Sequence, residues 1–424
     1  MRWLRGLLPL LALGAVLASC TGTTENVPPL LLAVGRVDTS VTPAQPQMVL
    51  VEDNFASNLT VARDLTVVAG SARDLPFPAV ASDVVDRAGS RSTLAVLSRD
   101  LTVAGGATPA PASYLLTFNL QGIDPASPTA FTQDSSLQLT GAAGAVFPPG
   151  SSGSPWCFSG ISVSRTGCYV TLLDDPAACG DTSGRYPRLF QLDTGVSPVT
   201  VTPVEVAGGG VQTTQATVPY DDQATTDELL YFLVPGVSDA QVYADPVPHL
   251  STTTPSTAIA NLPTQQQTGL LGNGEEVLAI TNQDPTRVNG STSQLEAVSV
   301  TSPHTVTHVP TVAGARALAV DTRGITAQAV VAGSSQLAVH TTPSDGTPAK
   351  TAVGYVFTGV AAAIDPINQF AYVVDDKQIV VLDLLTVAGG SGSWYAPFSP
   401  DLRLPVSAAT GQEATTVAWT RASP

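Results

Sequence analysis

Four histidines are the side chains best suited to bind a metal or to act as a general base: His249, His304, His308 and His340. His304 and His308 are four residues apart, a spacing that would pair them on a helix. Their Val and Thr neighbours favour a strand instead, where the two rings share one face about 13 Å apart. A single metal ion cannot bind both at that separation, so the spacing favours surface histidines.

Acidic residues occur in pairs at Asp174-Asp175, Asp221-Asp222 and Asp375-Asp376. The segment from Asp174 to Asp181 comes closest to a calcium loop but lacks the glycine placement and the closing glutamate. Carboxylates that cap turns are the preferred interpretation. The chain also has no G-x-S-x-G elbow, phosphate-binding loop or dinucleotide fingerprint. We therefore assign no catalytic residue, no metal site and no cofactor.

The first twenty residues carry a different chemistry, that of export and lipid attachment. Arg2 and Arg5 precede an apolar stretch at residues 7–17, which is too short to span a bilayer as a stable anchor. The segment Leu17-Ala18-Ser19-Cys20 follows and resembles the lipobox of bacterial lipoproteins. The resemblance implies cleavage before Cys20 and acylation of that cysteine with fatty-acid chains such as palmitate. The alternative is an ordinary signal peptide cleaved near Ala18.

These features divide the chain into a signal peptide at residues 1–19, a lipidated tether at residues 20–29 and one folded domain at residues 30–424. The tether is polar and ends in Pro28-Pro29. Lipoprotein sorting implies a lipid-anchored location in the bacterial cell envelope. Because Thr21 follows the cysteine, the resemblance implies the outer membrane if the cell has two membranes.

The composition limits the partners. The chain has a net charge of −16, and only 12% of its residues are charged. An acidic chain argues against nucleic acid and against anionic lipid surfaces as partners. We find no second apolar run of the length needed for a membrane helix. The expected partners are the membrane, through the lipid on Cys20, and an unidentified envelope protein or ligand.

Three further cysteines lie close together, at Cys157, Cys168 and Cys179. An oxidising compartment favours one disulfide. We expect a Cys157–Cys179 bond across the ends of a hairpin that turns at residues 165–167, with Cys168 left over. A zinc site is the alternative, but no histidine lies nearby and no C-x-x-C pair exists.

The segment from Gly359 to Thr386 indicates the architecture. It contains three short apolar runs, Val360–Ile364, Phe370–Val374 and Ile379–Leu384, separated by Asp-rich breaks. Each run is too short for a helix and is rich in Val, Ile and aromatic residues, so each is predicted to be a strand. Three hairpin-linked strands without a helix are one unit of a repeated sheet.

Similar units recur at intervals of roughly 40–60 residues, as expected of propeller blades. The segments FAYVV at residues 370–374 and VVLDL at residues 380–384 resemble the YVTN-type β-propeller repeat. That family implies an all-β propeller, but it fixes no catalytic residue. We expect seven blades, with six as the alternative because RDLTVVAG at residues 63–70 resembles RDLTVAG at residues 99–105. A pair of stacked β-sandwiches is the main rival architecture.

The two ends of the folded domain complement each other. The C-terminal segment Glu413–Arg421 is typical of a first strand but has no room for its partners. The N-terminal unit, by contrast, contains apolar runs at residues 30–34, 48–52 and 65–68 but lacks a first strand. We expect the C-terminal strand to join the N-terminal blade, because this pairing closes the ring and removes two exposed edges.

Six aromatic residues fall in segments expected to join one blade to the next: Phe77, Phe147, Trp156, Trp394, Tyr395 and Phe398. Gathered on one face of a propeller, they could form a binding rim. They could equally cover the core beneath long loops.

The residues thus favour a lipid-anchored envelope propeller that acts as a binding or scaffolding module and is not an enzyme. The alternative is a lactonase-like hydrolase with a metal at the channel mouth, which would need at least three convergent carboxylate, Asn or His side chains.

Overall fold

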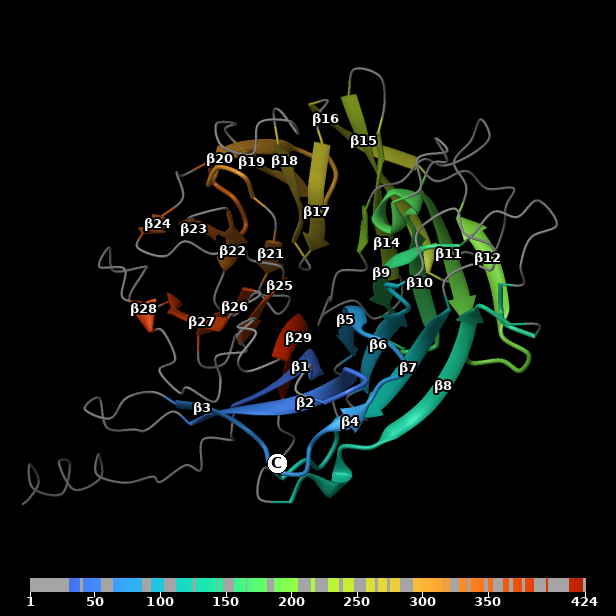
Figure 1. Ribbon diagram of the computed structural model, residues 1–424. Helices are drawn as coiled ribbons and strands as arrows, with labels where there is room; N and C mark the ends of the chain where they lie inside the picture. Colours follow the sequence, from blue (N-terminus) through green and yellow to red (C-terminus); the bar gives the residue numbers. More distant parts are fainter. Residues whose placement is uncertain are drawn as a thin grey trace, which may run out of the picture.

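The computed structural model describes the chain from residue 30 to residue 421 apart from intervening segments, the longest being 55–63, 103–111, 205–214, 218–227, 248–256, 283–292, 385–393 and 396–411. The described elements are almost all β-strands, interrupted by the short 3-10 helices η1 (Pro128–Ala130) and η2 (Pro176–Cys179). The strands form seven small antiparallel sheets around a common centre (Figure 1).

The first sheet joins the two ends of the folded chain. It contains β1 (Leu30–Asp38), β2 (Gln45–Asn54), β3 (Asp64–Val67), the short β4 (Arg73–Asp74) and β29 (Gln412–Arg421). Strand β29 pairs antiparallel with β1, and Leu32 lies opposite Trp419. The predicted closure by the C-terminal strand is confirmed.

The other six sheets follow in chain order, each with four strands. The second contains β5 (Ala79–Val85), β6 (Thr93–Arg99), β7 (Ser113–Asn119) and β8 (Gln133–Thr140). The third contains β9 (Phe158–Val163), β10 (Tyr169–Asp174), β11 (Arg188–Asp193) and β12 (Thr200–Val204). The fourth contains β13 (Gln215–Thr217), β14 (Glu228–Pro235), β15 (Asp239–Val247) and β16 (Thr257–Pro263). The fifth contains β17 (Gln266–Gly272), β18 (Glu276–Asn282), β19 (Ser293–Ser299) and β20 (Val306–Pro310). The sixth contains β21 (Ala317–Val320), β22 (Gln328–Ala332), β23 (Gln336–Thr341) and β24 (Lys350–Val353). The seventh contains β25 (Ala361–Asp365), β26 (Phe370–Asp375), β27 (Gln378–Asp383) and β28 (Trp394–Tyr395).

The innermost strands form a closed cycle. They are β29, β5, β9, β13, β17, β21 and β25, and each contacts the inner strands of the two neighbouring sheets. The first sheet is bonded to both of its neighbours. The Tyr372 hydroxyl of the seventh sheet donates to Asp53 Oδ2 at 2.7 Å, and the hydroxyl oxygens of Thr416 and of Ser82 in the second sheet are 2.5 Å apart. The chain is a seven-bladed β-propeller, so the seven-blade prediction is confirmed over the six-blade alternative.

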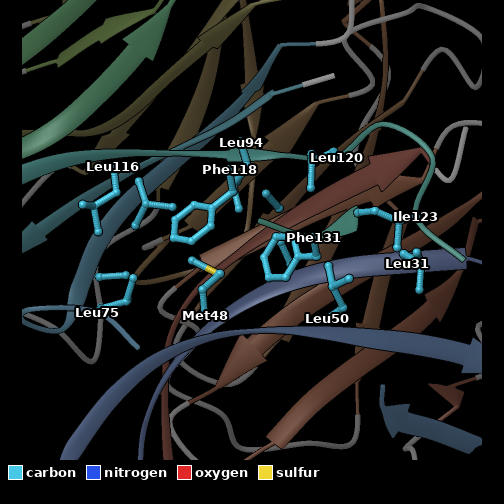
Figure 2. Close-up of a cluster of buried hydrophobic side chains, with 14 of the residues drawn as sticks. Leu31, Met48, Leu50, Leu75, Leu94, Leu116, Phe118, Leu120, Ile123 and Phe131 are labelled. Atoms are coloured by element: carbon cyan, nitrogen blue, oxygen red, sulfur yellow. The ribbon is translucent and has the colours of Figure 1, made fainter. Parts of the chain in front are cut away.

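The hydrophobic core is divided among the interfaces between successive sheets. Figure 2 shows the interface of the first and second sheets, where Leu31 and Met48 face Leu94 and Phe118. The next residue of β1, Leu32, points the other way and packs with Tyr372 of the seventh sheet. Because both faces of the middle strands are largely buried, many of these strands are apolar runs, such as AVVA in β22 and IVVL in β27. Burying one such large side chain stabilises the fold by about 1.5–3 kcal/mol.

The outer strands are the elements that sequence patterns missed. Strand β8, for example, reads QDSSLQLT, and its first four residues are exposed. An edge strand with one solvated face does not need an apolar run, so hydrophobicity does not reveal it. Strand β28 was also expected to be a connection, but it pairs with β27, with Trp394 opposite Leu382.

Candidate functional site

The strand directions define two faces of the ring. All strand pairings are antiparallel, so neighbouring strands of a sheet run in opposite directions between the two faces of the ring. The strand next to the innermost one therefore begins on the same face in every sheet. We call the face where β1 begins at Leu30 and β18 begins at Glu276 the pocket face. The opposite face carries the connections from each outer strand to the next inner strand, and we call it the crossover face.

A cavity of about 200 Å³ opens on the pocket face between the fifth and sixth sheets. Its lining comes from the start of β18, the β19–β20 hairpin and the turn after β23: Glu275, Glu276, Ala297, Ser299, Thr305, Thr307, Pro343 and Ser344. The hairpin is fixed by a bond from Ser299 N–H to Thr305 O and by His304, whose Nδ1 lies 2.9 Å from Ser299 O.

Glu276 is the central charged group of this cavity. The residue is 3% exposed, and its Oε2 accepts the Ser344 backbone N–H at 2.8 Å, which ties the fifth sheet to the sixth. Burial raises the pKa of Glu276 to about 7, with a smaller upward contribution from Glu275, while the Ser344 bond acts in the opposite direction. Because the pKa is raised on folding, this carboxyl stabilises the fold at low pH, and that contribution is lost as pH rises from about 4.5 to about 7.

The lining chemistry selects the kind of ligand. Two carboxyl groups and several hydroxyls accept and donate hydrogen bonds, and the described lining contains no lysine, arginine or histidine. Such a cavity favours a neutral or cationic polar group over an anion.

The three histidines that the structure describes do not form part of a metal-binding group. The Nδ1 of His308 contacts a carboxylate oxygen of the buried Glu296, which also accepts a bond from the Thr281 hydroxyl at 3.2 Å. His340 is buried, and its Nε2 lies 2.8 Å from the Thr311 hydroxyl. Burial lowers the pKa of His340 to about 4, so it is neutral at physiological pH. His249 lies outside the described residues.

The acidic pairs also have separate surroundings. Asp174 is fully buried, and its two oxygens accept the Cys157 backbone N–H at 2.7 Å and an Arg188 N–H at 3.2 Å. It therefore fixes the start of β9 against the end of β10. Asp375 ends β26, while Asp221, Asp222 and Asp376 lie outside the described residues.

Two of the cysteines are joined. Cys157 and Cys179 form a disulfide with a Cα–Cα separation of 6.1 Å, and Cys168 is a free thiol. Cys157 precedes β9 and Cys179 ends η2, so both lie on the crossover face beyond the ends of the β9–β10 hairpin. Cys20 and the tether are outside the description.

The described rim aromatics mostly pack against the protein. Phe147 is 4% exposed and joins the core between the second and third sheets, where Trp156 packs against it with ring centroids 5.2 Å apart. Phe147 is therefore a core side chain and not part of an open patch. Phe77 is half-buried, and its ring centroid lies 6.1 Å from that of Tyr114. The side chains of Trp394 and Tyr395, and all of Phe398, lie outside the description.

Asp83 is a carboxyl on an inner strand that was not predicted to be important from the sequence. Asp83 lies in β5, and its Oδ2 accepts the Val163 N–H of the neighbouring inner strand at 2.7 Å. Burial raises the pKa of Asp83 to about 6, although this bond and one from Val84 lower it. The signal that could have revealed it is an acid within the otherwise uncharged strand AVASDVV.

Within the described residues, no group of three or more His, Cys, Asp and Glu side chains is arranged to hold a metal ion. The described part of the chain likewise contains no helix with the length and apolar character needed to cross a membrane.

Comparisons with known proteins show similarity at the level of the fold. No protein-family model matches the chain, and no curated protein matches it. Among solved structures, the chain is similar to a candidate 6-phosphogluconolactonase from Bacteroides uniformis ATCC 8492, at 11% identity and a TM-score of 0.53, over 92% of this chain and 99% of that one. It also matches a functionally unknown protein from Desulfotomaculum acetoxidans DSM 771, at 12% identity and a TM-score of 0.42, over 67% of this chain and 75% of that one. The β-propeller domain of the Trilobed protease from Pyrococcus furiosus matches at 7% identity and a TM-score of 0.40, over 71% of this chain and 79% of that one. At these identities the likeness concerns the fold alone.

Proposed function

We propose that this chain is a lipid-anchored β-propeller of the bacterial cell envelope that acts as a binding or scaffolding module. The observation that carries the proposal is the Leu17-Ala18-Ser19-Cys20 motif, placed ten residues before the first strand of a ring closed by its own last strand. A ring closed by its own last strand suits a rigid platform, because only the outer strands of the blades remain as short edges. The described residues contribute no convergent catalytic set.

The tether sets the orientation of the platform. Residues 20–29 span at most about 36 Å when fully extended. They join β1 at Leu30, on the pocket face, so that face is held toward the bilayer. The crossover face then points away from the membrane and presents the surface for a protein partner. The cavity with Glu276 faces the space between ring and membrane.

Detergent phase partitioning of the full-length protein expressed in bacteria tests the anchor. The wild type should enter the detergent phase, Cys20→Ala should remain in the aqueous phase, and Cys168→Ser should behave as the wild type. Labelling with an alkyne analogue of palmitate should follow the same order. An unchanged detergent fraction in Cys20→Ala would contradict lipid attachment.

A second candidate is a lactonase-like hydrolase. It draws support from the fold shared with the candidate 6-phosphogluconolactonase and from Glu276, a carboxyl with a pKa near 7 inside a cavity. A base with that pKa could activate a water molecule. A phosphorylated lactone is an anion, however, and Glu275 and Glu276 would repel it. This charge mismatch favours the binding module.

Lactone hydrolysis separates the two candidates. We expect neither 6-phosphogluconolactone nor the uncharged gluconolactone to be hydrolysed above the spontaneous rate, with or without added Ca²⁺. Catalysis that follows an apparent pKa near 7 and disappears in Glu276→Gln would favour the enzyme. The Gln side chain can still accept the Ser344 bond, which makes it the matched replacement.

A further inference from the structure

The two sulfurs of the Cys157–Cys179 disulfide have different surroundings. Cys157 is 1% exposed at the start of β9. Cys179 is partly exposed, and its neighbours Ala178 and Gly180 are exposed. A thiolate arriving from solution therefore reaches Sγ of Cys179 more readily than Sγ of Cys157.

A buried cation contacts the inner sulfur. Arg99 ends β6 in the second sheet and is 6% exposed. Its Nη1 lies 3.0 Å from Sγ of Cys157 and also donates to Phe158 O at 2.8 Å, while its Nη2 donates to Ala178 O at 3.4 Å. Burial lowers the pKa of Arg99 and Asp175 raises it, but a guanidinium stays charged in proteins. A positive charge in a region of low dielectric stabilises a thiolate at this sulfur.

Two acids lie nearby and oppose that effect. Asp174 accepts the Cys157 backbone N–H and pairs with Arg188, so its charge is partly neutralised. Asp175 follows it and interacts electrostatically with Arg99. Among the described residues, the charged group in direct contact with the sulfur is the Arg99 guanidinium.

We propose that Cys157–Cys179 is a thiol-exchange site in which Arg99 stabilises Cys157 as the leaving thiolate. A thiolate of an external dithiol attacks Sγ of Cys179, the Cys157–Cys179 bond breaks, and the electron pair stays on Sγ of Cys157. The second thiolate of the dithiol then attacks the first dithiol sulfur, which is now bonded to Sγ of Cys179. The bond to Cys179 breaks, and the released Cys179 thiolate takes up a proton. The dithiol is oxidised to a disulfide, and the protein disulfide is reduced by two electrons.

The exchange is favoured by a good leaving group, because a thiol of lower pKa leaves faster. The same property makes the disulfide easier to reduce than a structural bond between ordinary thiols. Reduction would remove the covalent link between η2 and the start of β9, and the Arg99 bonds to Phe158 O and Ala178 O would remain as the noncovalent contacts there. The crossover face, which the proposed orientation points away from the membrane, would then depend on redox conditions.

A redox titration of the full-length protein with reduced and oxidised dithiothreitol tests the proposal. Cys20→Ala and Cys168→Ser are placed in every variant, so the remaining pair is followed alone by alkylation. Compared with the protein that retains Arg99, the Arg99→Met variant should have an equilibrium constant for reduction at least tenfold lower. This corresponds to a reduction potential about 30 mV lower for a two-electron couple. Arg99→Lys should retain most of the effect. Equal constants for all three would reduce Arg99 to a structural residue and overturn the proposal.

Two readouts keep the test decisive if Arg99→Met does not fold. The thiolate absorbance of reduced Cys157, measured in a Cys179→Ser variant that retains Arg99, should titrate below the free-cysteine pKa of about 8.5. A midpoint at or above that value would overturn the proposal. Brief exposure to glutathione should also give a mixed disulfide on Cys179, as found by peptide mass spectrometry. Glutathione on Cys157 would contradict the assigned direction of attack.

Discussion

The pentapeptide Arg-Asp-Leu-Thr-Val occurs twice, at residues 63–67 and 99–103, and the two copies fold differently. The first copy supplies β3, where Leu65 pairs with Asp53 of β2 and is 0% exposed. The second copy begins at the last residue of β6 and continues into a bend, where Leu101 is 53% exposed. The same side chain is thus a core residue in one place and a solvated one in the other.

The difference shows that neighbouring strands decide what the pentapeptide becomes. The first copy pairs with β2, and its Leu65 lies in the core between the seventh and first sheets. In the second copy, Asp100 Oδ1 accepts both the backbone N–H and the hydroxyl of Thr102, which closes a local turn. Local propensity is the same, so the available pairing partner determines the structure.

The largest effect should come from the leucines. Leu65→Ala removes a fully buried side chain and should lower the free energy of unfolding by about 2–5 kcal/mol. Leu101→Ala, its counterpart in the second copy, should change that energy by less than about 0.5 kcal/mol. Urea unfolding followed by tryptophan fluorescence measures both. Similar losses in the two variants would show that the copies do not differ as described.

Arg99 comes next, because its guanidinium bonds to the backbone oxygens of Phe158 in β9 and Ala178 in η2. Arg99→Met keeps the aliphatic stem but leaves buried acceptors without this donor, which should destabilise the protein by about 1–3 kcal/mol. The measurement is the urea midpoint under oxidising conditions, with Arg99→Lys as the control. A midpoint unchanged in the Met variant would mean that these bonds contribute nothing net.

A smaller loss is expected at Gly70, three residues after the first copy, where the chain turns with φ of +78°. A Cβ added there would meet nothing closer than a Pro128 ring atom at 4.0 Å, so the cost is conformational. Gly70→Ala should destabilise the fold by about 1–2 kcal/mol because L-residues disfavour positive φ. Gly70→Asn tolerates this region better and should recover part of the loss when both variants are measured by the same urea unfolding.

The smallest expected effect is that of the turn in the second copy. Asp100→Ala removes the two bonds to Thr102, both of which are exposed, and should cost about 0.5–1 kcal/mol. Asp100→Asn, which can still accept them, serves as the control. A loss larger than that of Leu65→Ala would reverse the proposed ranking of the two copies.

The apolar patterns predicted the ring well because each middle strand is buried on both faces. The run FAYVV falls within β26, and LLLAV begins β1. Strands with few apolar residues, such as β8, could not be found in this way. The cavity beside Glu276 was also not predictable, since its walls come from two different sheets.

The sequence by itself determined that repeated short strands would build a propeller and that its last strand would complete the first sheet. It also carries the Cys20 motif, which stays a prediction. Only the tertiary structure decided which polar groups meet. Glu276 bonds to Ser344, 68 residues away, and Arg99 reaches Cys157 across 58 residues. Such contacts arise where neighbouring sheets pack, and short-range patterns along the chain do not encode them.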